Sequence, residues 1–258
     1  MQMLASPATR IPTMPFTTDF YSVFDDAELR LAGLNLQAII AVSELPEALQ
    51  SVLANSQVGT TPVKTLLLFG NGGPAFWQAY QGFQTTDPHP VDAFSRHLVT
   101  DFMKRCWPAT DYRFLYPGSA AVPLQALGQH VGWHHDSPMK VGINDTWGLW
   151  YAYRALVALA DEWEPSRTVP SVSPCQTCHD KPCIKACPPK ALDDQQLRLE
   201  RCIDFRLLEG SVCSHQCLAR GACPIAPEQR YSQDQIQYHY GHSLPCLRQW
   251  RTESKGST

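Results

Sequence analysis

The segment KTLLLF at positions 64–69 forms a short apolar run, which ends at the sequence Gly-Asn-Gly-Gly at positions 70–73. A short continuous apolar run bounded by glycine is typical of a buried strand. We therefore expect a strand over 64–69 that enters a turn at 70–73. A glycine-rich turn of this kind also offers backbone N–H groups to a phosphate, which makes Gly72 a candidate cofactor-binding residue; a simple turn after a strand is the alternative.

Four further segments have a readable period. Apolar positions recur every three to four residues over 91–105, after two prolines, and again over 122–131, so both segments are expected to be helices. Residues 112–116 and the aromatic, apolar run 147–159 are expected to be strands. This mixture of helices and strands predicts an α/β or α+β domain.

Proline and polar residues at 164–170 interrupt the pattern and predict a linker. The chain then divides into three parts: a large domain over 1–165, a cysteine-rich module over 166–226, and a polar, aromatic tail over 227–258 that packs on the first domain.

The charge and composition exclude several classes of protein. The 258 residues are 44% hydrophobic and 17% charged, with a net charge of −3, so no basic surface for nucleic acid is expected. No apolar run reaches the length of about 18 residues that a membrane span needs. The first sixteen residues lack the continuous apolar stretch of an export signal, which predicts a cytoplasmic protein.

Eight of the ten cysteines lie between residues 175 and 223, in two groups that each end in Cys-Pro. The first group has the spacing C-x2-C-x4-C-x3-C-P. Bacterial two-cluster ferredoxins have the run C-x2-C-x2-C-x3-C-P, whose last cysteine binds the other cluster. The same crossing here predicts two [4Fe–4S] clusters, one held by Cys175, Cys178, Cys183 and Cys223, the other by Cys187, Cys202, Cys213 and Cys217.

Other interpretations of these cysteines stay open. Two four-cysteine zinc sites or unpaired structural thiols are alternatives, although zinc sites do not require a Cys-Pro end. The gaps in the second group are unusual, so one intact cluster beside a degenerate one is another alternative. Cys106 and Cys246 lie outside both groups and are expected to be incidental thiols. His179 and His215, inside the cysteine loops, are expected to be loop residues or to contact the ligands without binding the metal.

Several segments carry a resemblance to known families. The order Gln129–Trp133, Lys140–Asn144, Trp147–Trp150, followed by the first cysteine group, resembles epoxyqueuosine reductases and, more distantly, reductive dehalogenases. The segment Glu200–Phe205 is similar to a signature between the clusters of the first family. The tail Pro227–Gln235 and the segment Asp87–Asp92 resemble the cobalamin-processing cblC-type family.

The resemblance implies a nitroreductase-like α/β sandwich domain that binds cobalamin, next to a two-cluster ferredoxin-like module. It places the loop 129–147 at the corrinoid, with Trp133, His134, His135, Asn144 and Trp147 as candidate cofactor-binding residues. Core packing of the tryptophans and a structural role for the histidines are the alternatives. FMN in the same cleft is the alternative cofactor, because function rests on the site and not on the fold.

One departure from the family pattern bears on the reaction. Epoxyqueuosine reductases carry a general-acid aspartate where this chain has Gly118, so no proton donor stands at that position. We therefore expect an iron–sulfur oxidoreductase that relays electrons to a bound corrinoid for its reduction or ligand removal, with no catalytic residue assigned. The alternatives are a ferredoxin-type carrier and a reductase of the epoxyqueuosine type. Expected partners are a corrinoid or other small molecule and an electron-donor protein, with a homodimer as a further possibility.

Overall fold

The computed structural model describes residues 25–119, 121–168, 170–194 and 196–255. Its centre is a four-stranded antiparallel sheet in the order β1 (Leu36–Ala41), β4 (Thr65–Gly72), β6 (Tyr151–Leu159) and β5 (Tyr112–Tyr116). Every residue of β4 is buried, as expected for a central strand that is covered on both faces. A separate short hairpin joins β2 (Gln57–Val58) to β3 (Thr61–Pro62).

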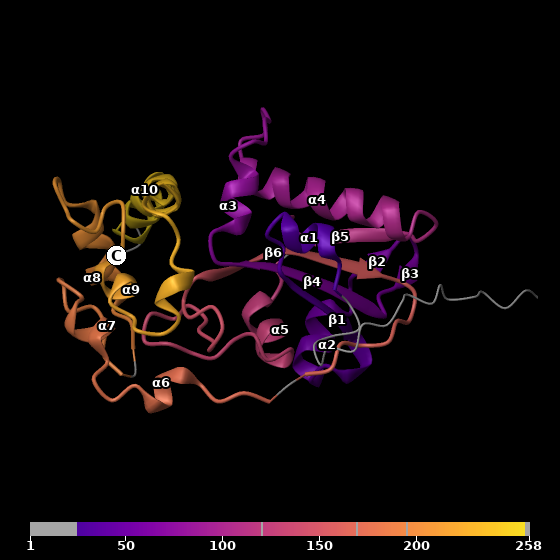
Figure 1. Cartoon of the computed structure of the whole chain (residues 1–258), viewed down its shortest axis with the longest axis horizontal. Coiled ribbons are helices and arrows are strands. Elements are labelled where there is room, and N and C mark those ends of the chain that lie inside the picture. Colours follow the sequence, from indigo (N-terminus) through magenta and orange to yellow (C-terminus); the bar gives the residue numbers. More distant parts are fainter. Residues whose placement is uncertain (1–24, 120, 169, 195, 256–258) are drawn as a thin grey trace, which may run out of the picture.

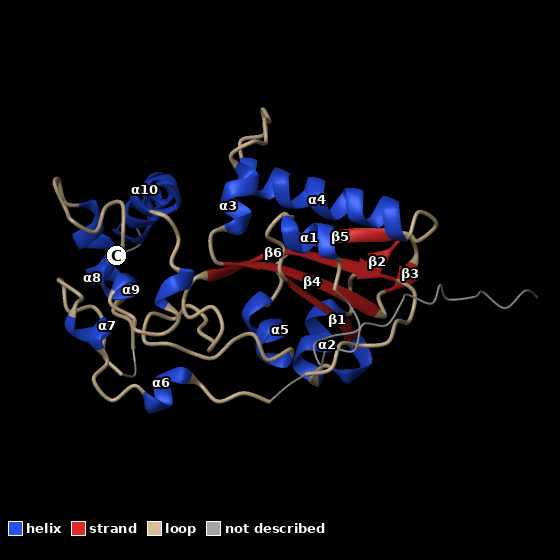
Figure 2. Cartoon of the chain, in the orientation of Figure 1, coloured by secondary structure: helices blue, strands red, loops and turns tan. Residues whose placement is uncertain are grey.

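Alternate residues of β4 supply two different cores. Leu67 and Phe69 pack with the helices α1 (Ala27–Leu31), α3 (Ala75–Tyr80) and α4 (Pro90–Cys106). Leu66 and Leu68 face the opposite way, toward α2 (Glu47–Leu53) and α5 (Leu124–His130). This period of two is that of a strand with both faces buried, and the two helical layers are visible in Figure 1 and Figure 2. The combination of helices and an antiparallel sheet confirms the α+β class.

Most of the expected elements are present. The helix expected over 91–105 is α4, the strand over 112–116 is β5, and the helix over 122–131 is the shorter α5. The strand expected from residue 147 starts only at Tyr151, because Asn144 and Gly148 form a bridge and the Trp150 N–H donates to the Trp147 carbonyl, which makes this stretch a turn.

The turn expected at residues 70–73 is wrong. Strand β4 continues through Gly72, where Asn71 pairs with Ala152 and Gly72 with Tyr151. The register shifts after Phe69, so the glycines mark an irregularity inside the strand and not its end. Among residues 70–73, only Gly73 has a left-handed conformation, with φ of +68°.

The cysteine-rich part contains short helices separated by loops: α6 (Pro174–Thr177), α7 (Pro182–Lys185), α8 (Leu199–Leu207) and α9 (Leu218–Gly221). Proline is the first residue of both α6 and α7, a position where its missing N–H costs no hydrogen bond. The buried residues here form two small clusters that include cysteines. This part lies beside one end of the sheet (Figure 1).

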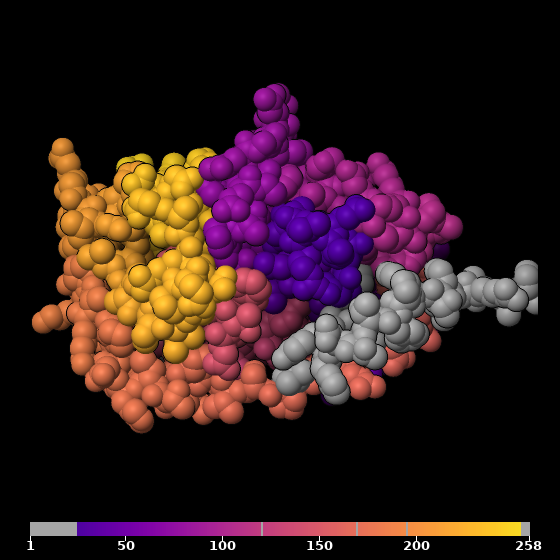
Figure 3. All heavy atoms as spheres, in the orientation of Figure 1, coloured from indigo at the N-terminus to yellow at the C-terminus, as the bar shows by residue number. Residues whose placement is uncertain are grey.

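The C-terminal helix α10 (Gln233–Lys255) contacts both parts of the molecule. Near its start, Asp234 accepts a hydrogen bond from Trp77 Nε1 at 2.7 Å, and the Tyr238 hydroxyl lies 3.2 Å from that of Tyr80. Near its end, Arg251 pairs with Asp204 of α8. In Figure 3 the C-terminal segment, in yellow, lies between the purple surface of α3 and the orange cysteine-rich part. The domain boundaries drawn from the sequence stay a prediction.

Two remaining predictions concern the ends and the membrane. The export-signal prediction falls on residues 1–24, which lie outside the described residues. Among the helices that the structure describes, none has the length and apolar character to cross a membrane.

Candidate metal centre

The fold gathers the first cysteine group from two distant segments. Cys175 belongs to α6 and Cys183 to α7, whereas Cys223 comes from the loop after α9. Cys175 and Cys223 share a small core with Ile143, Leu149 and Ile225. Burial, together with the thiols of Cys223, Cys183 and Cys178, raises the pKa of the Cys175 thiol to about 11. These four cysteines therefore lie within electrostatic range of one another.

The second group has the same crossed arrangement. Cys187 follows α7, Cys202 belongs to α8, and Cys217 caps α9, where its Sγ accepts the backbone N–H of Arg220 at 3.4 Å. Burial, together with the thiols of Cys217, Cys187 and Cys213, raises the pKa of Cys202 to about 11. The thiols that influence one another's pKa are thus the same two sets of four that the ferredoxin-like spacing predicts, and their role as metal ligands stays a prediction.

The arrangement of these thiols limits the chemistry they can perform. Cys183, Cys187, Cys213 and Cys223 are each at most 9% exposed, and no cysteine is in a disulfide. Among the described residues, no group of three or more His, Cys, Asp or Glu side chains is placed to hold a single metal ion. Four thiolates at one site repel one another unless a positively charged centre binds them, and that binding releases their protons.

The remaining two cysteines and the two loop histidines belong to neither of the two predicted sets of ligands. Cys246 is exposed on α10, and Cys106 at the end of α4 lies beside Asp26, 3.9 Å from its Oδ2. Neither contributes to the raised pKa of Cys175 or Cys202. The ring of His215 approaches the backbone of Gly241 in α10.

The six candidate cofactor-binding residues lie in one neighbourhood, but most of their polar atoms are already used. Asn144 donates from Nδ2 to the Trp133 carbonyl at 2.9 Å and accepts from the Trp147 N–H at 2.8 Å, so its amide closes the loop. The ring of Trp147 packs on Gly72, where a Cβ would come within 2.1 Å of it. The Gly72 N–H and carbonyl both hydrogen-bond the Asn35 side chain. The predicted binding roles of these residues stay predictions.

The two histidines differ in their surroundings. His134 is 4% exposed; its Nδ1 lies 3.2 Å from the Tyr153 hydroxyl and 3.4 Å from the Tyr151 hydroxyl. Burial lowers the pKa of His134, and the carboxylate of Asp136, 3.6 Å from Nε2, opposes that shift. His135 instead reaches Ser171 in the linker, with Nε2 to Oγ at 2.7 Å.

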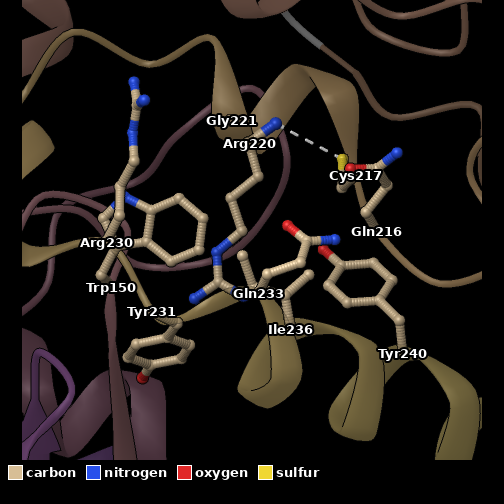
Figure 4. Close-up of a pocket in the computed structure, with 10 residues that line it drawn as sticks. All are labelled: Trp150, Gln216, Cys217, Arg220, Gly221, Arg230, Tyr231, Gln233, Ile236 and Tyr240. Atoms are coloured by element: carbon tan, nitrogen blue, oxygen red, sulfur yellow. Dashed lines mark hydrogen bonds between the residues drawn. The ribbon is translucent and has the colours of Figure 1, made fainter.

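A cavity of about 210 Å³ lies between the second cysteine group and the C-terminal helix. Arg220 crosses it with its guanidinium 4.4 Å from the Trp150 ring and 5.1 Å from the Tyr231 ring (Figure 4). The guanidinium also donates to the Leu149 carbonyl at 2.6 Å. The other residues that line the cavity are Gln216, Cys217, Gly221, Arg230, Gln233, Ile236 and Tyr240. Little in the sequence indicates this cavity; its one signal is an arginine three residues after a candidate ligand.

The fold and the two cysteine groups together define an α+β protein with a cysteine-rich module against its sheet domain. No family model and no curated protein sequence matches the chain. Solved structures do. Epoxyqueuosine reductase from Streptococcus thermophilus aligns at a TM-score of 0.50 with 13% identity, over 80% of this chain and 65% of that one. The Bacillus subtilis enzyme, with its catalytic aspartate loop swung out of the active site, aligns at a TM-score of 0.51 with 14% identity. The alignment covers 80% of this chain and 65% of that one.

A third epoxyqueuosine reductase structure, which holds an epoxyqueuosine-modified tRNA stem loop, aligns at 0.51 with 15% identity, over 81% of this chain and 66% of that one. This chain thus spans about 65% of the length of the reductases it matches. The likeness confirms the predicted resemblance at the level of the fold. A B12-trafficking protein, CblC, from C. elegans aligns at only 0.43 with 12% identity, over 83% and 89%, a likeness too weak to assign a fold.

Proposed function

We propose that this protein is an iron–sulfur oxidoreductase in which two [4Fe–4S] clusters relay electrons to a cofactor on the sheet domain. The observation that carries the proposal is that the eight thiols fall into two sets whose members influence one another's pKa: Cys175, Cys178, Cys183 and Cys223 in one, Cys187, Cys202, Cys213 and Cys217 in the other. Each group takes its Cys-Pro cysteine from the other half, as in two-cluster ferredoxins. A nitroreductase-like domain beside a ferredoxin-like module is the architecture that this proposal requires.

The donor set fits iron–sulfur clusters better than zinc. A tetrahedral zinc site with Zn–S bonds of about 2.3 Å brings its sulfurs within about 4 Å of one another. Both cysteine runs here end in Cys-Pro, which two-cluster ferredoxins have and zinc sites do not require. In a [4Fe–4S] cluster each of four thiolates binds a different iron, so the ligands surround a larger centre. The clusters would supply one-electron transfer; the protein supplies the thiolates and excludes water from them.

We propose cobalamin as the cofactor on the sheet domain, with FMN as the alternative, in the neighbourhood of the loop 133–147. Fold likeness to epoxyqueuosine reductases supports this domain as a cofactor scaffold. The loop is closed by Asn144, and Trp147 covers the end of β4, so their role would be to shape the wall beside the cofactor. His134, with Asp136 on one nitrogen and two tyrosine hydroxyls at the other, is the group here best placed to move a proton.

The substrate is the least constrained part of the proposal. Gly118, which follows β5, provides no carboxyl group where the reductases have a general acid, and this favours corrinoid reduction or ligand removal over epoxide reduction. The net charge of −3 led us to expect no nucleic acid. Since a similar reductase holds a tRNA stem loop, RNA binding is an alternative that a direct binding assay should test.

The test is an anaerobic purification with assays of iron, acid-labile sulfide, zinc and cobalt, repeated after incubation with cobalamin and with FMN. About eight irons per chain and a retained, shifted corrinoid spectrum are expected. Eight irons with neither cofactor retained would indicate the second candidate, a ferredoxin-type carrier that passes electrons to a separate enzyme. Zinc in place of iron under strictly anaerobic conditions would overturn both.

A further inference from the structure

Arg206 connects three segments through neutral acceptors only. From α8 its Nε donates to the Cys213 carbonyl at 3.3 Å, and its Nη2 donates to the Tyr240 carbonyl at 3.1 Å and the Ser243 Oγ at 2.9 Å. The guanidinium also lies 4.8 Å from the ring centre of Tyr240. These contacts hold the second cysteine loop and the C-terminal helix against α8.

The positive charge of Arg206 has no carboxylate partner within ion-pair distance in the described part of the chain. The two acidic residues that α8 could offer are engaged by another arginine: Arg251 Nε lies 2.7 Å from Asp204 and its Nη1 lies 3.9 Å from Glu200. By contrast, Lys181, the cation beside the first cysteine group, forms an ion pair with Asp194. A half-buried guanidinium with neutral acceptors keeps most of its field, because neither a counter-charge nor bulk water cancels it.

This field acts on the second cysteine group. Cys202 and Arg206 are four residues apart on α8, so they lie on the same helix face. Arg206 also donates to the carbonyl of Cys213, so its guanidinium lies beside two members of the second group. The first group has Arg230, which donates to the Cys223 carbonyl at 3.3 Å. In Figure 4 the guanidinium of Arg230 extends away from Arg220 and Tyr240.

We propose that Arg206 raises the reduction potential of the second cluster above the value that this cluster would have without the guanidinium. The inference rests on the proposed function. Reduction adds one electron to the cluster and makes its net charge one unit more negative, and a nearby uncompensated cation stabilises that reduced form. The electron comes from an external one-electron donor protein, or from dithionite in the test, and no bond is made or broken.

The experiment is an anaerobic redox titration followed by electron paramagnetic resonance on wild-type protein, Arg206→Gln, Arg206→Lys and Arg201→Gln. The signal of the second cluster is identified by its loss in Cys202→Ser. We expect a more negative potential for that cluster alone in Arg206→Gln, most of the wild-type value in Arg206→Lys, and no shift in Arg201→Gln. The Arg201→Gln substitution is the matched control, because it removes the same charge from an exposed position on the same helix.

Each other outcome has a defined meaning. An unshifted second cluster in Arg206→Gln, with iron content intact, would overturn the inference and leave the proposed function standing. Loss of the second cluster in both Arg206→Gln and Arg206→Lys would also overturn it, because the role would then be structural. A wild-type protein without two reducible clusters would instead refute the proposed function itself.

Discussion

Cys178 is the residue whose substitution most directly tests the grouping of the ligands. Its thiol contributes to the raised pKa values of Cys175, Cys183 and Cys223, all in the first group. We expect Cys178→Ala to lower the iron content from about eight to about four per chain and to remove one of two cluster signals. Cys246→Ala, at an exposed position on α10, is the control and should keep both, as should Cys106→Ala. Equal losses from both signals in Cys178→Ala would contradict the assignment.

His239 gives the molecule a pH dependence whose direction can be worked out. Burial lowers the pKa of His239 to about 4, and the guanidinium groups of Arg154 and Arg220 contribute to the same shift. An unfolded histidine titrates near 6.5. Because the folded-state pKa is the lower one, the neutral form is favoured by folding, and this stability is present above about pH 6.5. It is lost as the pH falls from about 6.5 toward 4.

We therefore expect the free energy of unfolding to decrease by about 2 kcal/mol between pH 7.5 and 5 through this group, with the slope reduced in His239→Gln. The measurement is anaerobic denaturant unfolding at several pH values. His89→Gln, at an exposed site before α4, is the control and should keep the wild-type slope. A slope that is the same in His239→Gln and wild type would show that His239 is not the titrating group.

The residue scale also shows which parts of the site could be predicted from sequence. The cysteine spacing alone predicted two sets of thiols, and the thiols that influence one another's pKa in the structure fall into the same sets; metal binding by them stays a prediction. The importance of Arg206 and Arg220 could not be predicted, because it depends on neutral partners in distant segments: Tyr240 and Ser243 for the first, Trp150 and Tyr231 for the second. Nothing in the local sequence distinguishes these arginines from exposed ones such as Arg201.

At the scale of elements, periodicity predicted α4 and β5 well because their apolar positions follow the period of one regular structure. The end of β4 was not predictable in this way. Gly70 and Gly72 would ordinarily indicate a turn, but here they stay in the strand because other groups occupy the space of a side chain. A Cβ on Gly70 would lie 2.9 Å from the Ala152 carbonyl oxygen, and one on Gly72 only 2.1 Å from the Trp147 ring. Such tertiary contacts leave no local signal.

The packing of Trp147 on β4 predicts the effect of a single methyl group. Gly72→Ala should lower the free energy of unfolding by about 1–3 kcal/mol, because the ring of Trp147 has to move or the strand has to shift. Gly82→Ala is the matched control, since its Cβ would meet only the Ala79 carbonyl oxygen at 3.8 Å. Denaturant unfolding of the two variants under the same conditions measures the difference. Equal stability would mean that Trp147 is free to leave β4.

At the scale of the whole molecule, the two parts obtain their stability in different ways. The sheet part has two large apolar cores, one on each face of β4 and β6. In the described residues, the cysteine-rich part has one small cluster of its own, which includes Cys183 and Cys187, while Cys223 packs with Ile143 and Leu149 of the loop before β6. Three of its helices are four residues long. Helices that short are not stable alone. The bound clusters would therefore act as the core of this part, as structural metals do in other small modules.

Removal of iron should consequently unfold one part before the other. We expect hydrogen exchange, followed by mass spectrometry, to become at least about tenfold faster over α6, α7 and α9 after anaerobic chelation, while β4 and β6 keep their protection. The start of α10 should stay protected through Trp77 and Tyr80, whereas its Arg251 end should lose protection together with α8. Cys246→Ala treated in parallel controls for thiol modification. Unchanged protection of the short helices in the iron-free protein would show that the polypeptide, and not the clusters, holds the cysteine-rich part together.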